Sequence, residues 1–209
     1  MKDSYHEEGI TSLKSMFNSS NSQSGGDSMQ KITPFLWFDN QAEEAAKFYV
    51  SIFSAAGGSQ PDRWLAGASG GKNSKMGNIT RYGKEGYEIH RRPAGTAMTV
   101  QFQLEGQDFV ALNGGPVFKF NEAISFQVLC KTQEEVDYYW EKLSEGGDKK
   151  AQQCGWLKDK YGLSWQIVPA VLSQMLRDKD AKKSDRVMKA LLQMKKIDAK
   201  LLEQAYEKE

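Results

Sequence analysis

The side chains best able to bind a metal or attack a substrate are few in this 209-residue sequence: Cys130, Cys154, His6 and His90. A structural zinc site needs four such ligands, usually in closely spaced pairs, and no two of these residues have that spacing. Two distant cysteines also make no disulfide framework. The sequence therefore predicts neither a zinc site nor disulfides, and we expect a protein of a reducing compartment, the cytoplasm.

Cys154, which precedes Gly155, is the candidate nucleophile. A thiol attacks as its thiolate, which requires a neighbouring base or cation. No motif ties either histidine to Cys154, so a packing role is favoured over a catalytic one.

A more informative pattern is the alternation of amide and hydroxyl side chains with apolar ones. Residues 98–104 read Met-Thr-Val-Gln-Phe-Gln-Leu, and residues 124–129 read Ile-Ser-Phe-Gln-Val-Leu. Successive side chains of a strand point to opposite faces, so the apolar set packs under helices and the polar set points away from them. The residues expected on that second face are Thr33, Phe35, Trp37, Thr99, Gln101, Gln103, Ser125, Gln127, Ser164 and Gln166.

Such a face, with aromatic walls and neutral hydrogen-bonding groups, suits an uncharged and partly aromatic ligand. Trp156 is a further candidate for stacking on the ligand, whereas Trp165 has the opposite parity to Gln166 and is predicted to lie in the core. An alternative stays open: the polar side chains pair with one another or with water on a solvated or dimer-covered face.

Several predicted elements position these side chains. Residues 1–29 are rich in Ser, Asn and Gly and are predicted to be a disordered arm. A strand at 32–38 leads into a helix that starts at an N-cap, Asp39 or Asn40, and runs through Phe53. The expected elements that follow are a long loop at 57–75, strands at 79–82, 98–104, 109–113 and 124–129, a helix at 133–143, a hairpin at 154–168 and helices within 170–208.

Two segments about 90 residues apart share one design. The first contains Phe35-Leu36-Trp37-Phe38, Glu43-Glu44 and Phe48-Tyr49; the second contains Phe126-Gln127-Val128-Leu129, Glu134-Glu135 and Tyr139-Trp140. Each unit is too small to bury its sheet alone, so the two are expected to pair. The expected domains are the arm 1–29, a paired domain at 30–169 and a C-terminal helical extension at 170–209 that packs on it.

The paired design resembles the vicinal-oxygen-chelate (glyoxalase and bleomycin-resistance) superfamily. The stretches at 118–126, 133–137, 154–159, 164–169 and 194–198 resemble its PhnB-like branch, named for 3-demethylubiquinone-9 3-methyltransferase. The resemblance covers about residues 30–206. It implies an α+β fold in which two βαβββ modules form a curved mixed sheet, and it implies a homodimer.

The resemblance also places the metal ligands of the superfamily on the concave sheet face. The matching positions here are Thr33, Ala123, Gln166, and either Ala111 or Asn113. None offers an imidazole or a carboxylate, and amide oxygens alone bind transition metals weakly. The resemblance also brings Cys154 near the rim of this site. The candidate ligand-binding residues are therefore Thr33, Phe35, Trp37, Gln101, Asn113, Ser125, Gln127, Cys154, Trp156 and Gln166, with no metal and no cofactor.

Charge and hydropathy restrict the classes of partner that this protein is expected to bind. Lys plus Arg is 28 against 27 for Asp plus Glu, so no charge excess favours nucleic acid or an anionic membrane. The sequence also lacks an apolar run long enough to span a bilayer. Methyl transfer from S-adenosylmethionine, which the branch name implies, lacks the usual glycine-rich strand-to-helix turn. A metal-independent small-molecule-binding protein or enzyme is the favoured prediction; a ligand-sequestering protein and a genuine methyltransferase remain alternatives.

Overall fold

The computed structural model describes residues 30–56 and 73–208; the predicted arm at 1–29 and most of the predicted 57–75 loop lie outside them. The first module contains β1 (Phe35–Phe38), α2 (Ala42–Ala55), β2 (Lys75–Arg81), the single turn α3 (Tyr87–His90), β3 (Ala97–Leu104) and β4 (Gln107–Asn113). Its four strands have the order β1-β4-β3-β2, with β1 parallel to β4 and the other pairs antiparallel.

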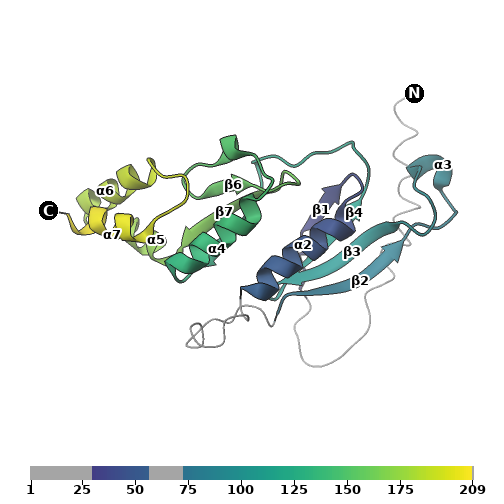
Figure 1. Ribbon diagram of the computed structural model, residues 1–209, viewed down its shortest axis with the longest axis horizontal. Helices are drawn as coiled ribbons and strands as arrows, with labels where there is room; N and C mark the ends of the chain where they lie inside the picture. The colour runs from purple at the N-terminus through teal and green to yellow at the C-terminus, as the bar shows by residue number, and fades with distance from the viewer. Residues whose placement is uncertain (1–29, 57–72, 209) are drawn as a thin grey trace.

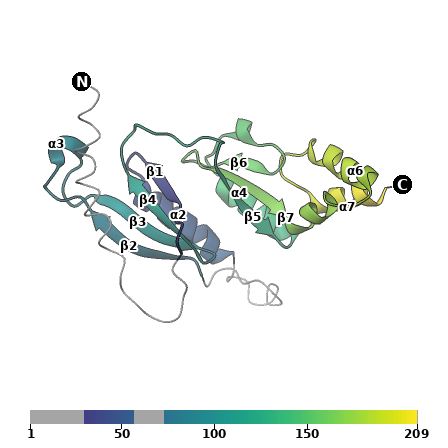
Figure 2. The same ribbon diagram turned by 180° about the vertical axis from the view of Figure 1, so that it is seen from behind.

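The second module repeats the plan with fewer strands. It contains β5 (Ser125–Cys130), α4 (Gln133–Ser144), the 3-10 turn η2 (Lys149–Ala151), β6 (Trp156–Lys158) and β7 (Ser164–Pro169). The order is β5-β7-β6, again with the first strand parallel to the last, and β5 is seen beside β7 in Figure 2. One isolated bridge, between Gln153 and Trp156, extends this smaller sheet.

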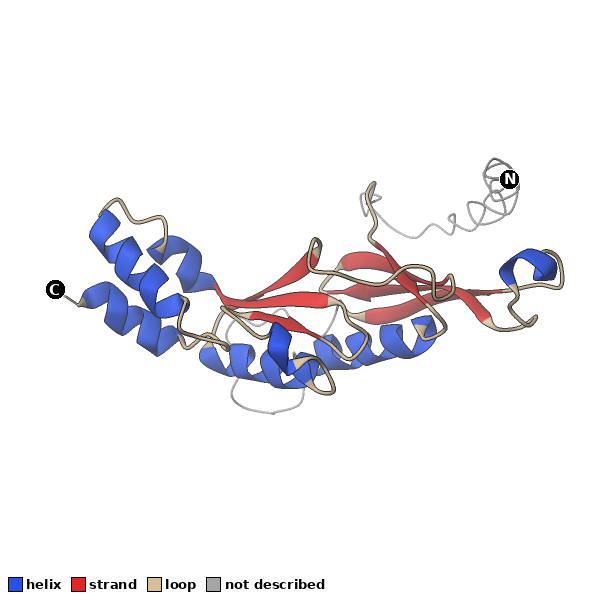
Figure 3. Ribbon diagram, turned by 90° about the horizontal axis from the view of Figure 1, so that it is seen from above, coloured by secondary structure: helices blue, strands red, loops and turns tan. Residues whose placement is uncertain are grey.

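The two modules lie side by side, and α2 and α4 cover the same side of both sheets (Figures 1 and 3). Among residues 30–56 and 73–208, no helix covers the other side of the sheets. The predicted α+β fold of two paired modules is therefore confirmed, and the sheets curve without closing into a barrel.

Aromatic side chains under these helices form the main core. Trp165 is 2% exposed, as its parity predicted, and its ring lies 5.5 Å from that of Tyr49 on α2 and 5.8 Å from that of Phe53. Phe102 packs on Tyr49 from β3. The core therefore runs continuously from the first module into the second.

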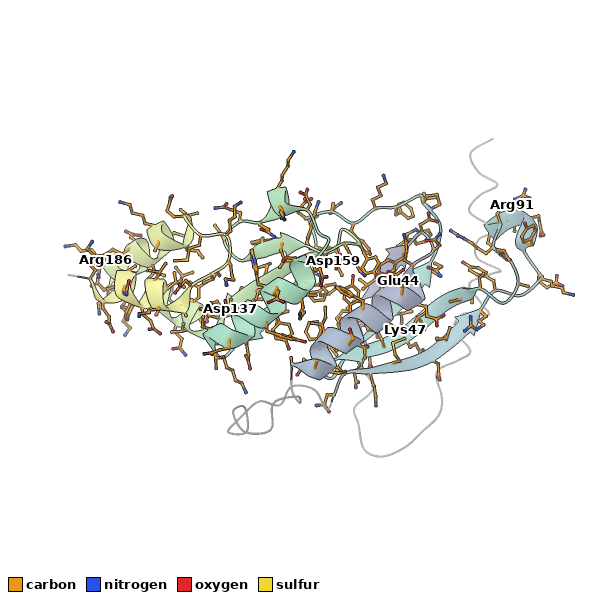
Figure 4. All side chains as sticks on the ribbon, viewed as in Figure 1. Glu44, Lys47, Arg91, Asp137, Asp159 and Arg186 are labelled. Atoms are coloured by element: carbon orange, nitrogen blue, oxygen red, sulfur yellow. The ribbon has the colours of Figure 1, made fainter. Side chains whose placement is uncertain are left out.

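A buried carboxylate also joins the modules. Asp159 is 2% exposed and lies between them (Figure 4). Its Oδ2 accepts hydrogen bonds from the Tyr49 hydroxyl (2.8 Å) and Trp165 Nε1 (2.9 Å), and its Oδ1 accepts from the backbone N–H groups of Tyr161 (2.8 Å) and Leu163 (3.0 Å). Burial raises the pKa of the Asp159 carboxyl, and the hydrogen bonds oppose that rise.

The start of α2 differs from the prediction of a side-chain cap by Asp39 or Asn40. The N-cap position is Gln41, whose side chain makes no capping hydrogen bond. Instead, Oδ1 of Asn113, at the end of β4, accepts from the Ala42 N–H at 2.8 Å. The cap is thus supplied by a residue distant in sequence, which a local capping rule does not detect.

Three C-terminal helices, α5 (Ala170–Met175), α6 (Ala181–Leu191) and α7 (Ala199–Glu207), form a second core at the end of the smaller sheet. Val187, Leu191 and Leu202 are buried there, whereas Leu201, predicted to belong to the same stripe as Leu202, is 49% exposed. Arg186 donates from α6 to the carbonyls of Ala205 and Tyr206 at the end of α7. None of the helices described is long and apolar enough to cross a membrane.

Candidate functional site

The side of the two sheets opposite α2 and α4, here called the open face, carries most of the predicted ligand-binding side chains. In the first module, strand register gives two rows across β1, β4 and β3: Phe35, Val110 and Gln101 form one, and Trp37, Leu112 and Thr99 form the other. The alternating residues Leu36, Phe38, Val100 and Phe102 are buried on the helix side. The predicted facing of β1 and β3 is therefore confirmed.

The second module contributes its own rows to the open face. Gln127 on β5 lies opposite Gln166 on β7, which lies opposite Trp156 on β6. Ser125 lies opposite Ser164 in the next row, and Gln166 Nε2 donates to Ser125 Oγ at 2.8 Å. Gln127 is exposed. Two amides, a hydroxyl and an indole thus lie next to one another on this half of the open face.

Ser164 adds an unsatisfied hydroxyl to this half. Its side chain is 1% exposed, and its Oγ has no hydrogen-bond partner among the described residues. An unpaired buried hydroxyl is unfavourable, so a water molecule or a small ligand group placed beside β7 would gain a hydrogen bond.

Trp37 is held in one orientation. Its Nε1 donates to the Gly115 carbonyl at 2.8 Å, and the Phe118 ring meets it edge-on with centroids 4.9 Å apart. Phe35 and Phe118 are 58% and 62% exposed, so both present apolar surface to solvent. The first module thus supplies the aromatic part of the open face.

Replacing Gly114 with alanine is expected to displace Trp37, because a Cβ at position 114 would overlap the indole ring itself. We expect a loss of roughly 1–3 kcal/mol in the free energy of unfolding, the usual cost of overpacking. Urea unfolding followed by circular dichroism would measure it. Gly83→Ala is the matched control, because its Cβ would meet only one atom, at 3.9 Å; equal losses in both variants would contradict the clash.

Two predicted site residues, Asn113 and Cys154, are placed differently from expectation, and a third, Thr33, lies outside the strands. Asn113 lies on the helix side, where its amide bonds Ala42 N and the Ala97 carbonyl, so its predicted place on the open face is corrected. Cys154 packs against the C-terminal core, and its N–H donates to the Met194 carbonyl at 2.8 Å. Thr33 is exposed and precedes β1.

Sequence reasoning missed Val110 and Leu112, which stand on the open face of β4. Phe109 and Ala111 point to the helix side and are buried, so both faces of this strand are apolar. Alternation gives no signal in such a strand. Only the pairing of β4 with β1 shows which β4 side chains lie on the open face.

The donors present do not fit a transition metal. The resemblance brings several positions together, and none of them suits a metal ion. The Ala111 side chain has no ligand atom, the Asn113 amide is hydrogen-bonded to the backbone, and the Gln166 amide is neutral. Within residues 30–56 and 73–208, no group of three or more His, Cys, Asp or Glu is placed to hold a metal ion. Neutral amide and hydroxyl oxygens bind such ions weakly.

Nor do the turns of the modules resemble a nucleotide site. The connections from β1 to α2 and from β5 to α4 are Asp39-Asn40-Gln41 and Lys131-Thr132, and neither contains glycine. A thiol nucleophile is also unsupported at Cys130, because burial raises the pKa of its thiol to about 12.

The chain matches a known protein family and resembles solved structures. The sequence profile of the family 3-demethylubiquinone-9 3-methyltransferase matches residues 30–60 and 68–168. One solved structure, from Bacillus cereus, is described as a putative 3-demethylubiquinone-9 3-methyltransferase and PhnB protein. It is 34% identical in sequence with a TM-score of 0.51, and the match covers 68% of this chain and all of the Bacillus cereus chain. A solved Pseudomonas aeruginosa protein is 16% identical in sequence with a TM-score of 0.44. The match covers 67% of this chain and 97% of the Pseudomonas aeruginosa chain.

None of the curated proteins matches the chain. The profile spans more than half of the sequence, and the Bacillus cereus protein is 34% identical over 68% of the chain. The chain therefore belongs to the 3-demethylubiquinone-9 3-methyltransferase family, the group that includes PhnB-like proteins.

Proposed function

We propose that this protein is a metal-independent small-molecule-binding protein that holds a neutral, partly aromatic ligand on the open face. The proposal rests on two features of the open face: a fixed indole, Trp37, with exposed rings in the first module, and the amide row Gln127 and Gln166 in the second. Rings supply contact area and amides supply orientation, which is the usual composition of a small-molecule site.

A quinone-like compound is the ligand class we favour. Carbonyl oxygens on a flat ring accept hydrogen bonds from amide N–H groups, and the flat ring packs on aromatic side chains. The family name, and the description of the Bacillus cereus relative, both refer to a ubiquinone precursor.

Binding explains the site better than catalysis does. The amides of Gln127 and Gln166 and the hydroxyl of Ser125 have no useful acid or base strength near neutral pH. A reaction on this face would have to rely on orientation alone. We therefore favour ligand holding, and sequestration as in bleomycin-resistance relatives is its simplest form.

We further propose that a second copy of the chain covers the open face, giving a homodimer in the cytoplasm. Phe35 and Leu129 on this face are 58% and 61% exposed. Exposing such large apolar side chains to water is unfavourable, and the pairing of two copies would bury them. Both cysteines are free thiols, which suits a reducing compartment.

The test is titration of a water-soluble methoxylated benzoquinone, followed by tryptophan quenching. We expect saturable binding that persists in a metal chelator, and a loss of roughly 10- to 30-fold in the double variant Gln127→Ala with Gln166→Ala, since each amide hydrogen bond is worth about 1 kcal/mol. Sedimentation of the same samples should give the mass of a dimer.

The matched control is Gln103→Ala. Gln103 bonds Asp108 Oδ1 at 2.9 Å within the first module and takes no part in the pairing of Gln127 with Gln166. Unchanged affinity in the double variant, or an equal loss in the control, would refute the proposed site. Saturable heat on adding S-adenosylmethionine would favour methyl transfer instead.

A further inference from the structure

A second row of polar side chains runs beside the amide row on the open face of the smaller sheet. Ser125 on β5, Ser164 on β7 and Lys158 on β6 lie opposite one another in the strand register. Their neighbours along the strands, Leu157 and Trp165, are buried on the helix side. The three polar side chains therefore share the open face, and we call them the donor row.

The donor row offers more hydrogen-bond donors than its neighbours accept. Ser125 Oγ already accepts from Gln166 Nε2 at 2.8 Å, so the O–H of Ser125 can donate to another group. The buried Ser164 hydroxyl has no hydrogen-bond partner among the described residues. The Lys158 ammonium has several N–H groups and is ion-paired with one carboxylate, that of Glu122. Together these groups suit an oxygen atom that only accepts hydrogen bonds.

Lys158 gives the donor row a positive charge that solvent screens only in part. Its side chain is 22% exposed, whereas that of its partner Glu122 is 60% exposed. A half-buried cation attracts an anion more strongly than a solvated one does. Glu122 lies in the connection that precedes β5, so its carboxylate can turn into water and leave the ammonium group to another anion.

The other charged groups around β6 are solvated or lie on the other side of the sheet. The turn η2 packs on β6, and with its N-cap it carries only exposed charged side chains: Asp148, Lys149 and Lys150. Lys119, in the same connection as Glu122, is also exposed. Asp159 is buried among its own donors, and the sheet separates the donor row from the carboxylates of α4. Among the described residues, Lys158 and Glu122 therefore dominate the charge at the donor row.

We infer that the donor row binds a ring hydroxyl of the open-face ligand as its anion, with Lys158 as the counter-ion and Ser125 and Ser164 as hydrogen-bond donors. The inference rests on the proposed function, because it concerns the ligand of that same face. On binding, the ligand O–H bond breaks, its proton goes to solvent and the Glu122 carboxylate turns to water. The ring itself packs beside Trp156, which stands on the same side of β6 as Lys158. The ligand class is thereby narrowed to phenols and hydroxyquinones.

The probe for the test is 4-nitrophenol, whose anion absorbs visible light. We expect the pKa of the bound probe to lie about one unit below that of the free probe, which corresponds to roughly tenfold tighter binding of the anion. Absorbance titration against pH would measure both quantities. Lys158→Met should abolish the shift, whereas Glu122→Gln should tighten binding of the anion, because it removes the competing carboxylate. Ser164→Ala should weaken the anion several-fold without lowering the stability of the free protein, since its hydroxyl has no partner to lose.

The matched control is Lys142→Met, which removes an ion-paired lysine from α4 and should leave the shift unchanged. A matched probe is 4-nitroanisole, the methyl ether, which has no proton to lose and should bind Lys158→Met as it binds the unaltered protein. Absence of saturable 4-nitrophenol binding, an unshifted pKa, or the same shift in Lys158→Met would overturn the inference. The proposed function would survive that result if 4-nitroanisole still bound and lost affinity in Gln127→Ala with Gln166→Ala. A shift that depends on Lys158, with unchanged affinity in that double variant, would instead support the donor row and refute the amide row.

Discussion

Replacing Asp159 with alanine is expected to lower the free energy of unfolding by about 3–5 kcal/mol, the usual cost of removing one side of a buried charged network. Four donors lose their acceptor at once: the Tyr49 hydroxyl, Trp165 Nε1 and two backbone N–H groups. Each is left buried or half-buried without a partner, which costs far more than losing a solvated contact. Urea unfolding followed by circular dichroism would measure the loss.

Two controls separate the parts of that effect. Tyr49→Phe removes only the hydrogen bond between the modules and keeps the ring in the core, so a loss of about 1 kcal/mol is expected. Asp185→Ala removes an exposed carboxylate of α6 and should change stability by less than about 0.5 kcal/mol. A small loss in Asp159→Ala, close to that of Asp185→Ala, would show that Asp159 does not join the modules.

Asp159 also shows how far a motif can be interpreted from sequence alone. The run from Asp159 to Gly162 predicts a turn, and the turn is present: Gly162 has a φ of 86° and its N–H donates to the Asp159 carbonyl. The hydrogen bond from Tyr49 comes from a residue 110 positions earlier in the sequence. Local turn chemistry is readable, whereas a partner brought by the other module is not.

The direction in which the strand side chains face is likewise predictable where it depends on local sequence and unpredictable where it depends on distant contacts. Alternation of polar and apolar residues placed Gln101, Gln127 and Gln166 correctly, because one face of each strand is apolar and the other is not. In β4 both faces are apolar, and Asn113 faces the helix side because α2 needs an acceptor at its start. Tertiary contacts therefore decide the facing of a strand such as β4, whose own sequence is ambiguous.

The packing of the C-terminal helices also depends on contacts that the local sequence does not reveal. Helical spacing predicted buried residues in α6 and α7 and did not say which surface they cover. The structure shows that the chain covers itself: Cys154 N donates to the Met194 carbonyl, and Gly155 N donates to the Lys195 carbonyl at 2.7 Å. The Gln133 side chain bonds both Ile197 O and Ala199 N.

Gly155 is the residue on which this contact depends most, and Gly155→Ala should lower the free energy of unfolding by about 3 kcal/mol. Its φ of 84° strains any other residue by roughly 1 kcal/mol. In addition, a Cβ would lie 2.7 Å from Ile197 Cδ1 and 2.9 Å from the Ile167 carbonyl oxygen. The backbone oxygen cannot rotate away, so overpacking adds about 2 kcal/mol.

Gly162→Ala isolates the strain from the crowding, because Gly162 has nearly the same φ, 86°, and nothing within 4 Å of its Cβ position. We expect a loss of only about 1 kcal/mol there. Hydrogen exchange adds a local readout: the N–H of Cys154 should exchange faster in Gly155→Ala and unchanged in Gly162→Ala, since its acceptor, the Met194 carbonyl, lies in the segment displaced by the clash. Equal losses in the two variants would mean that the C-terminal segment is not packed against Gly155, and α5 to α7 would then need another surface to bury Val187 and Leu202.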